Sequence, residues 1–170
     1  MRVFGIDCGT NCTGYGVVDV QSGRLETRLI AVAAGGLKLA KDQPLPVRLG
    51  YIFAELSALL ELHRPDVVAV EEVFYSVNAK SALKLGHVRG VALLAAAMRG
   101  LPVAEYSPLS IKSAVVGYGL AQKAQVQFMV ARLLNLDRSP EPADAADALA
   151  IAICHVHTAQ TLTLQAESRA

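Results

Sequence analysis

Two short apolar runs, each closing on a carboxylate, constrain the fold of this chain most. The run from Val3 to Ile6 ends at Asp7, and the run from Val67 to Val70 ends at Glu71. Apolar runs of this length are typical of strands that are buried on both faces of a sheet. An acid at the end of such a strand is poorly solvated and needs a partner. The partner that we infer for both acids is a divalent cation.

The pattern along the rest of the chain predicts an α/β fold. Alternating or continuous apolar residues predict strands at 2–7, 13–20, 24–32, 66–71 and 102–106, the second and third forming an antiparallel hairpin. Apolar residues at three- and four-residue steps, with Pro, Asn and Gly at the ends, predict helices at 45–63, 78 to about 99, 108–116, 122–135 and 143 to about 157. We therefore expect a mixed five-stranded sheet with helices on both faces.

The length and composition are those of one domain. A chain of 170 residues with 53% hydrophobic content can bury one core and is too short for two ordinary domains. We expect the domain to span residues 1–158 and residues 159–170, which are polar and lack periodicity, to form a mobile tail. The longest apolar run, Val91 to Met98, is too short for a membrane span. The odd number of cysteines favours a reducing compartment, so we expect a cytoplasmic protein without a membrane association.

The charges are distributed unevenly along the chain. Residues 73–138 contain eight basic and two acidic residues, whereas residues 1–72 contain seven basic and nine acidic, and residues 139–170 contain one basic and four acidic. A basic central segment between acidic ends fits a metal site beside a phosphate-binding surface. Its lysines, among them Lys80 and Lys84, are candidates for DNA contact. The alternative is that they form an ordinary solvated face.

Two further acids, Asp144 and Asp147, open the last predicted helix. Their spacing places both on one side of its first turn, where the helix dipole favours negative charge. If this helix packs on the sheet, its start can meet Asp7 and Glu71 at the carboxyl ends of their strands. Four carboxylates suit two Mg²⁺ ions and metal-assisted phosphodiester hydrolysis. The alternative is that Asp144 caps the helix and Asp147 is exposed.

Several motifs, in this order along nearly the whole chain, resemble the RuvC family of bacterial Holliday-junction resolvases. They are the segments 4–7 (FGID), 71–74 (EEVF), 78–86 (NAKSALKLG), 106–108 (YSP), 115–117 (VVG) and 144–150 (DAADALA). One departure is Cys8, where the family usually has Pro after the first Asp. Because the carboxylate of Asp7 is unaltered, we expect activity to survive this change.

The resemblance implies a ribonuclease-H-like fold and a homodimer that resolves four-way DNA junctions by symmetric nicking of two opposed strands during recombination and repair. It also implies dependence on Mg²⁺, with Mn²⁺ as a substitute, and a partnership with the RuvA and RuvB branch-migration complex. The family's catalytic, metal-binding acids fall on Asp7, Glu71, Asp144 and Asp147. The resemblance places the helix that follows residue 78 at the dimer interface.

The resemblance also implies residues that contact DNA. The family's aromatic residue at the junction core falls on Phe74, and two functionally important lysines fall on Lys112 and Lys123. Phe74 and Tyr75 directly follow a predicted catalytic segment, so an exposed ring there could stack on an unpaired base. The lysines could contact backbone phosphates. The alternatives are a core Phe74 and two solvated lysines.

Two other functions remain open from the residues alone. The first is a ribonuclease-H-like nuclease that acts on another nucleic acid. The second starts from Asp7 to Thr10 followed by Gly14, which resemble the phosphate-binding turn of actin-like ATPases. Those ATPases close two such domains over a nucleotide, and this chain is long enough for one.

Overall fold

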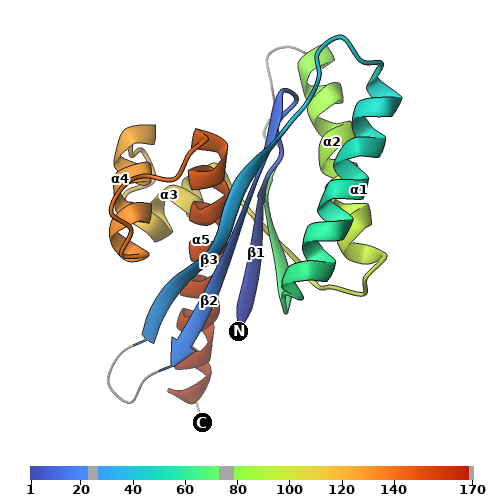
Figure 1. Ribbon diagram of the computed structural model, residues 1–170. Coiled ribbons are helices and arrows are strands. Elements are labelled where there is room, and N and C mark those ends of the chain that lie inside the picture. The colour runs from blue at the N-terminus through green and yellow to red at the C-terminus, as the bar shows by residue number, and fades with distance from the viewer. Residues whose placement is uncertain (23–26, 73–78, 169–170) are drawn as a thin grey trace.

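A mixed five-stranded sheet forms the centre of the molecule (Figure 1). The computed structural model describes residues 1–22, 27–72 and 79–168. The strands are β1 (Arg2–Asp7), β2 (Cys12–Ser22), β3 (Thr27–Lys38), β4 (Val67–Glu71) and β5 (Val103–Tyr106). Their order is β3-β2-β1-β4-β5. The pairs β3–β2 and β2–β1 are antiparallel, and the pairs β1–β4 and β4–β5 are parallel.

Helices cover both faces of this sheet. They are α1 (Leu45–His63), α2 (Ala79–Ala97), α3 (Pro108–Val116), α4 (Lys123–Leu133) and α5 (Ala143–Glu167). The helices α1 and α2 lie on one face, and α3, α4 and α5 lie on the other (Figure 1). The predicted mixed sheet with an antiparallel hairpin and helices on both faces is confirmed. Within the ranges that the structure describes, no helix has the length and apolarity needed to cross a membrane.

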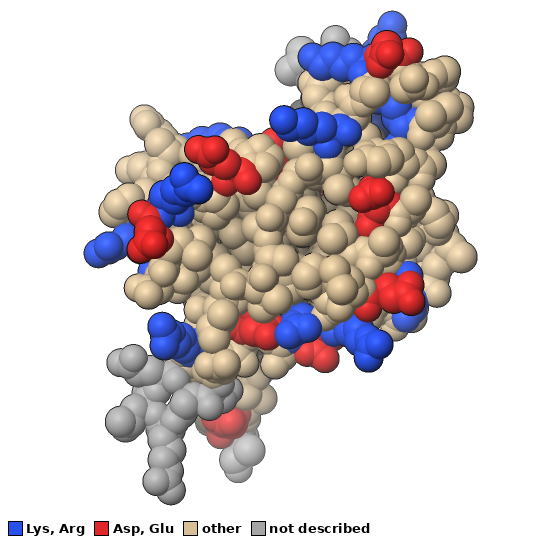
Figure 2. Space-filling view, viewed as in Figure 1, with Lys and Arg blue, Asp and Glu red and all other residues tan. Residues whose placement is uncertain are grey.

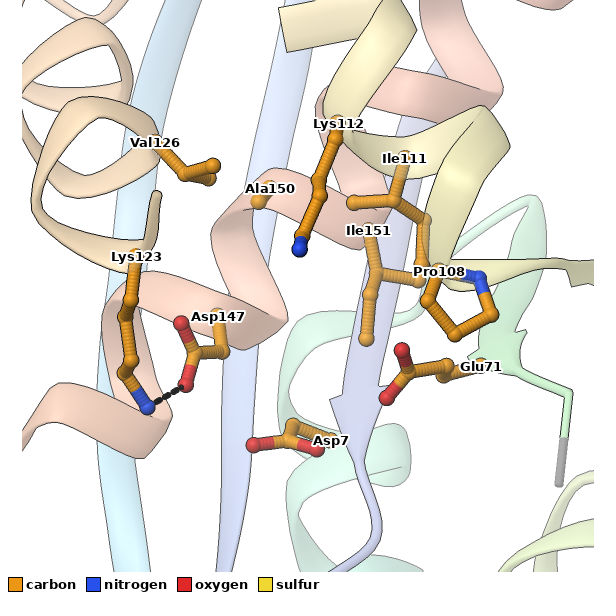
Figure 3. A pocket seen from close by; sticks show the side chains of 10 residues that line it. All are labelled: Asp7, Glu71, Pro108, Ile111, Lys112, Lys123, Val126, Asp147, Ala150 and Ile151. Carbon is orange, nitrogen blue, oxygen red and sulfur yellow. Dashed lines mark hydrogen bonds and ion pairs between the residues drawn. The ribbon is translucent and has the colours of Figure 1, made fainter. Parts of the chain in front are cut away.

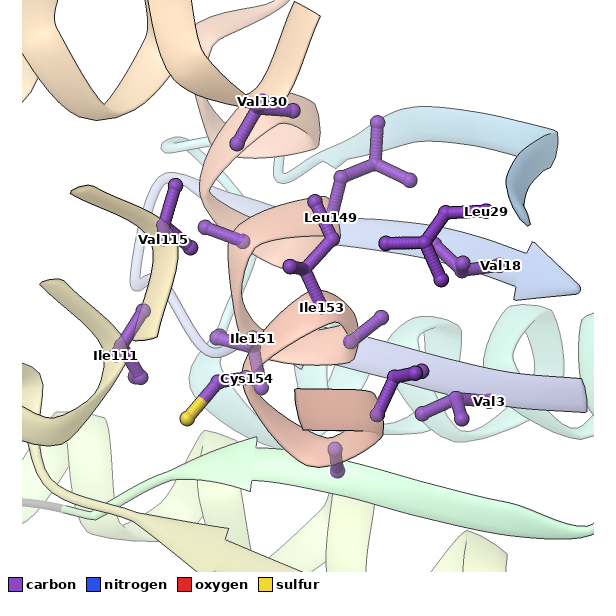
Figure 4. Packing of buried hydrophobic residues seen from close by; sticks show 14 of the residues in the cluster. Val3, Val18, Leu29, Ile111, Val115, Val130, Leu149, Ile151, Ile153 and Cys154 are labelled. Atoms are coloured by element: carbon purple, nitrogen blue, oxygen red, sulfur yellow. The ribbon is translucent and has the colours of Figure 1, made fainter. Parts of the chain in front are cut away.

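The alternation of side chains along each strand separates two cores and decides where the acids point. Phe4 and Ile6 of β1 pack with α1 and α2, whereas Val3 packs with α5 on the opposite face (Figure 4). Because successive side chains alternate between faces, Asp7 lies on the α5 face with Val3. On β4, Ala69 packs on the α5 face, so Glu71, two residues later, lies there as well.

Glycines in β1 and β2 let α5 approach the sheet at backbone distance. A Cβ added to Gly5 would collide with the carbonyl oxygen of Ala148, and one added to Gly14 would collide with that of Asp144. A Cβ on Gly16 would lie 2.8 Å from the amide nitrogen of Leu149. The first turns of α5 are thus held directly against the strands that carry the site.

Two elements extend further than the sequence predicts. The third strand was expected at 24–32 but is described from Thr27 to Lys38, because its Ala and Gly residues pair with β2 as far as Cys12. Gly35 and Gly36 lie in this extension. Their missing side chains leave room for neighbouring groups, since a Cβ on Gly35 would lie 2.8 Å from the ring of Tyr15.

The last helix was expected to end near His157 but continues to Glu167. In this polar end, the hydroxyls of Thr161 and Thr163 donate to carbonyls four residues earlier and are thus satisfied within the helix. Residues 161–168 are exposed. The mobility of residues 159–170, and the boundary of the domain at 158, stay predictions.

Candidate active site

Three of the four predicted acids line one open pocket at the carboxyl end of the parallel strands. Asp7 comes from the end of β1, Glu71 from the end of β4 and Asp147 from the first turns of α5, and their carboxylates point toward one another (Figure 3). The pocket has a volume of about 240 Å³, and its remaining wall is largely apolar. Strand ends and a helix start therefore meet as the spacing predicts.

The fourth acid, Asp144, lies one turn earlier on α5 and is not among the residues that line this pocket. Its backbone lies against Gly14 of β2. Burial raises the pKa of Cys12 to about 11, together with the charge of Asp144 and the hydrogen bond that the Cys12 thiol donates to its carboxylate. Asp144 nevertheless lies close enough to Asp7 to contribute to the raised pKa of that carboxyl.

The crowding of acids in the pocket raises the pKa of two of them, in spite of the two lysines nearby. Burial, followed by the charges of Asp147, Glu71 and Asp144, raises the pKa of Asp7 from 3.8 to about 7. Burial and the charge of Asp147 also raise the pKa of Glu71, while Lys112 and Lys123 lower it. A carboxyl with such a pKa is poised to exchange its proton for a cation.

Lys112 and Lys123, the two lysines predicted to contact phosphates, both line this pocket. Lys123 Nζ lies 2.5 Å from Asp147 Oδ2, and this hydrogen bond raises the pKa of Lys123 (Figure 3). Lys112 is carried by α3, which begins at the N-cap Ser107 and ends at Gly117 with φ 82°. The predicted break after α3 thus separates the helices that bring the two lysines to the acids.

The donor set fits a hard divalent cation, which takes carboxylate oxygens. Within residues 1–22, 27–72 and 79–168, no three His, Cys, Asp or Glu side chains are already arranged to hold one ion. The ion pair between Lys123 and Asp147 engages one carboxylate oxygen. A metal ion held by Asp147 would compete with Lys123 for that oxygen.

Lys80 and Lys84, also predicted to contact DNA, do not line this pocket. Lys84 lines a separate small pocket beside Arg48, and Lys80 is exposed in the first turn of α2. Their contact with DNA stays a prediction. Phe74 and Tyr75 fall outside the described residues.

The sequence analysis missed a residue that holds the end of β4. Arg89 of α2 donates through Nε to the carbonyl oxygen of Glu71, at 3.3 Å, and its guanidinium pairs with Glu105 of β5. Its only signal in the sequence is a basic residue in the basic segment, which does not reveal a contact 18 residues away.

Burial raises the pKa of the Cys8 thiol to about 12, so a neutral thiol lies beside Asp7.

The fold and the acidic pocket together define a ribonuclease-H-like nuclease. The family model described as "Crossover junction endodeoxyribonuclease RuvC" matches residues 3–155. The chain therefore belongs to the RuvC family, whose members are metal-dependent nucleases that hydrolyse phosphodiester bonds in DNA. This membership favours the nuclease over the actin-like ATPase considered above.

Individual relatives match over nearly their whole length. The crossover junction endodeoxyribonuclease RuvC of Acidobacterium capsulatum is 66% identical over 170 residues, covering 97% of this chain and 98% of the relative. The solved structure of Thermus thermophilus RuvC is 37% identical, covers 95% of this chain and 96% of its own, and superposes with a TM-score of 0.86. A second structure, T. thermophilus RuvC in complex with Holliday junction substrate, is 35% identical with the same coverage and a TM-score of 0.85.

Proposed function

We propose that this chain is a structure-selective endonuclease that resolves four-way Holliday junctions by metal-dependent nicking of two opposed strands. The observation that carries the proposal is the convergence of Asp7, Glu71 and Asp147 with two lysines on one open pocket. The related Thermus protein in complex with a Holliday junction supports the same substrate. Such an enzyme acts in DNA recombination and repair, and we place it in the cytoplasm with the bacterial chromosome.

Asp7, Glu71, Asp144 and Asp147 are the residues that would hold Mg²⁺, or Mn²⁺ as a substitute, with two ions per site. When bound, a pair of such ions activates water and stabilises the departing 3′ oxygen of a phosphodiester. The raised pKa of Asp7 supports this assignment, because a carboxyl that is partly protonated at neutral pH becomes a full anion when a cation replaces its proton.

The chain's own residues bind and position the DNA backbone. Lys112 and Lys123 line the pocket, Lys123 with its ammonium beside Asp147, and both can meet phosphate oxygens beside the cleaved bond (Figure 3). Ile111, Val126 and Ile151 form an apolar wall that limits access of bulk water. We also propose Lys80 and Lys84, which do not line the pocket, and Phe74 and Tyr75 as further DNA contacts.

We further propose a homodimer formed through α2. The exposed side of this helix carries Leu83 and Leu94, which are 66% and 51% exposed. Between them, a Cβ added to Gly86 or Gly90 would meet nothing within 4 Å, so this side of the helix is open to the close approach of another helix. A two-fold dimer presents identical sites to a substrate that has its own two-fold symmetry. The branch-migration proteins RuvA and RuvB are the proposed further partners.

The test compares cleavage of a synthetic four-way junction with that of linear duplexes of the same arm sequences, in Mg²⁺. Wild type should introduce paired nicks in the junction alone. Asp7→Asn and Glu71→Gln should each abolish both nicks. Glu72→Gln is the matched control, because Glu72 follows Glu71 directly but is exposed on the opposite face. Equal cutting of duplex would favour a nuclease with another substrate, and full activity of Glu71→Gln would remove Glu71 from the site.

A further inference from the structure

A second open cavity, of about 220 Å³, lies at the same end of the sheet as the acids but on the α1 side. Its lining comes from the end of β3, the following loop and the first turns of α1, and includes Lys38, Gln43, Val47, Arg48 and Tyr51. Basic side chains gather at this end of the molecule, above β3 and α1 (Figure 2). Nothing in the proposed cleavage reaction uses this cavity.

Backbone contacts link the cavity to the turn that follows Asp7, although the cavity and the acidic pocket share no lining residue. Lys38 pairs with Cys12 across β3 and β2, and the next residue, Leu39, donates its amide to Asn11. Cys12 is the residue whose thiol meets Asp144. The turn after Asp7 therefore separates the two openings, and one polynucleotide strand crossing that turn could enter both.

The charge of the second cavity is positive and uncompensated. Its lining contains Lys38 and Arg48 and no acidic side chain. In the described part of the chain, neither cation forms an ion pair with a carboxylate. Arg48 donates through Nη2 to the carbonyl oxygen of Thr10, and its Nε is buried without a hydrogen-bond partner among the described residues. Asp42 lies in the same loop but does not line the cavity.

The cavity also presents an aromatic ring that the core does not use. Tyr51 is 43% exposed and adjoins Val47, which is 54% exposed, whereas the buried side of α1 is formed by Ile52, Leu56 and Leu60. Exposed aromatic rings beside cations are the chemistry that binds an unpaired nucleotide, since the ring stacks on the base and the cations meet the phosphate.

We propose that this cavity is a second DNA subsite, which holds one unstacked nucleotide of the strand that enters the acidic pocket. The base lies on the ring of Tyr51 and its phosphate meets Lys38 and Arg48. This subsite rests on the proposed function for its DNA substrate. It would anchor the strand across the Asp7 turn and so help to position the cleaved bond.

The base contact is tested with metal-free protein and four-way junctions that carry the fluorescent base 2-aminopurine at successive positions near the branch point. Stacking on Tyr51 should quench the fluorescence of one position at saturating protein. Tyr51→Leu should abolish this quenching, whereas Tyr118→Leu, which removes another exposed tyrosine, should keep it. Identical quenching patterns in wild type and Tyr51→Leu would overturn the proposal.

The phosphate contact is tested with a matched pair of lysines. Lys38→Met should weaken junction binding roughly fivefold near 0.1 M salt and should lower the slope of log affinity against log salt by about one. Lys41→Met should leave both unchanged, since Lys41 is exposed in the same loop but does not line the cavity. Equal slopes for the two variants would overturn the contact.

Two outcomes separate this proposal from its alternatives. If Tyr51→Leu shifts the sedimentation of the DNA-free protein from dimer to monomer, the cavity belongs to an interface between copies and the subsite is rejected. If wild type fails to cut junctions, the proposed function fails, but quenching that depends on Tyr51 would still establish the DNA subsite.

Discussion

At the scale of single residues, Asp7 is a carboxyl whose ionised form is disfavoured in the folded protein. Its carboxyl is half-buried at a strand end, and its pKa of about 7 reflects burial first and three neighbouring acids second. Because the pKa in the folded protein is above the ordinary value of 3.8, folding favours the protonated form. The contribution of Asp7 to stability is therefore fully present below about pH 4 and is lost as the pH rises through 7.

We expect Asp7→Asn to be more stable than wild type at high pH when metal is absent. A rise in pKa from 3.8 to about 7 corresponds to at most roughly 4 kcal/mol. The difference between variant and wild type should grow from about pH 4 to about pH 8, as measured by urea unfolding in a chelator. A difference that does not change with pH would show that Asp7 ionises normally in the folded protein.

We propose that Lys123 competes with a bound metal ion for the carboxylate of Asp147. The ion pair is partly exposed, so we expect its removal in Lys123→Met to tighten Mn²⁺ binding only about two- to fivefold. Titration of DNA-free protein at about pH 8.5, followed by electron paramagnetic resonance, would measure this directly. Lys80→Met, a substitution on α2 and outside the pocket, is the control. Weaker Mn²⁺ binding by Lys123→Met would argue against competition.

At the scale of elements, the site depends on how closely α5 approaches the sheet. The acidic start of this helix reaches β1 because glycines replace side chains where the backbones meet, at Gly5 and Gly14. The first turns of α5, residues 143–148, carry only Ala and Asp, so no long side chain holds them further from the sheet. A strand–helix contact of this kind cannot adjust by rotating a side chain, since the colliding atoms belong to the backbone.

Gly14→Ala should therefore displace the first turn of α5. We expect a loss of about 1–3 kcal/mol in the free energy of unfolding, as for other overpacked cores, and slower junction cleavage by the folded protein. Gly50→Ala is the control, because nothing lies within 4 Å of a Cβ there and α1 should gain about 0.5–1 kcal/mol. Unchanged cleavage by a folded Gly14→Ala protein would mean that the site tolerates a shifted helix.

At the scale of the whole molecule, we propose that the exposed side of α2 brings two copies of the chain, and so two sites, together. We expect Gly90→Arg to give a monomer in sedimentation at micromolar concentration, because a long charged side chain would prevent close helix approach. The variant should fold normally, since the position is open. Ala124→Arg on exposed α4 should remain dimeric. A Gly90→Arg protein that is still dimeric would place the interface elsewhere.

Much of this arrangement could be predicted from the sequence because it depends on short-range periodicity. The helix at Leu45–His63 was predicted with the bounds that the structure shows. The strand ends were enough to place Asp7 and Glu71 at one edge of the sheet, and the two-residue period of a strand was enough to turn Glu72 away from Glu71. The motifs also identified the family, since they recur in order along most of the chain.

Only the tertiary structure decided how these groups meet. Asp147 pairs with Lys123 of another helix, Asp144 turns toward Cys12, and Lys38, Arg48 and Tyr51 gather around a cavity of their own. Each of these contacts depends on the depth and angle at which helices dock on the sheet. Docking is set by side-chain and backbone packing between segments far apart in the chain, which no local pattern of residues records.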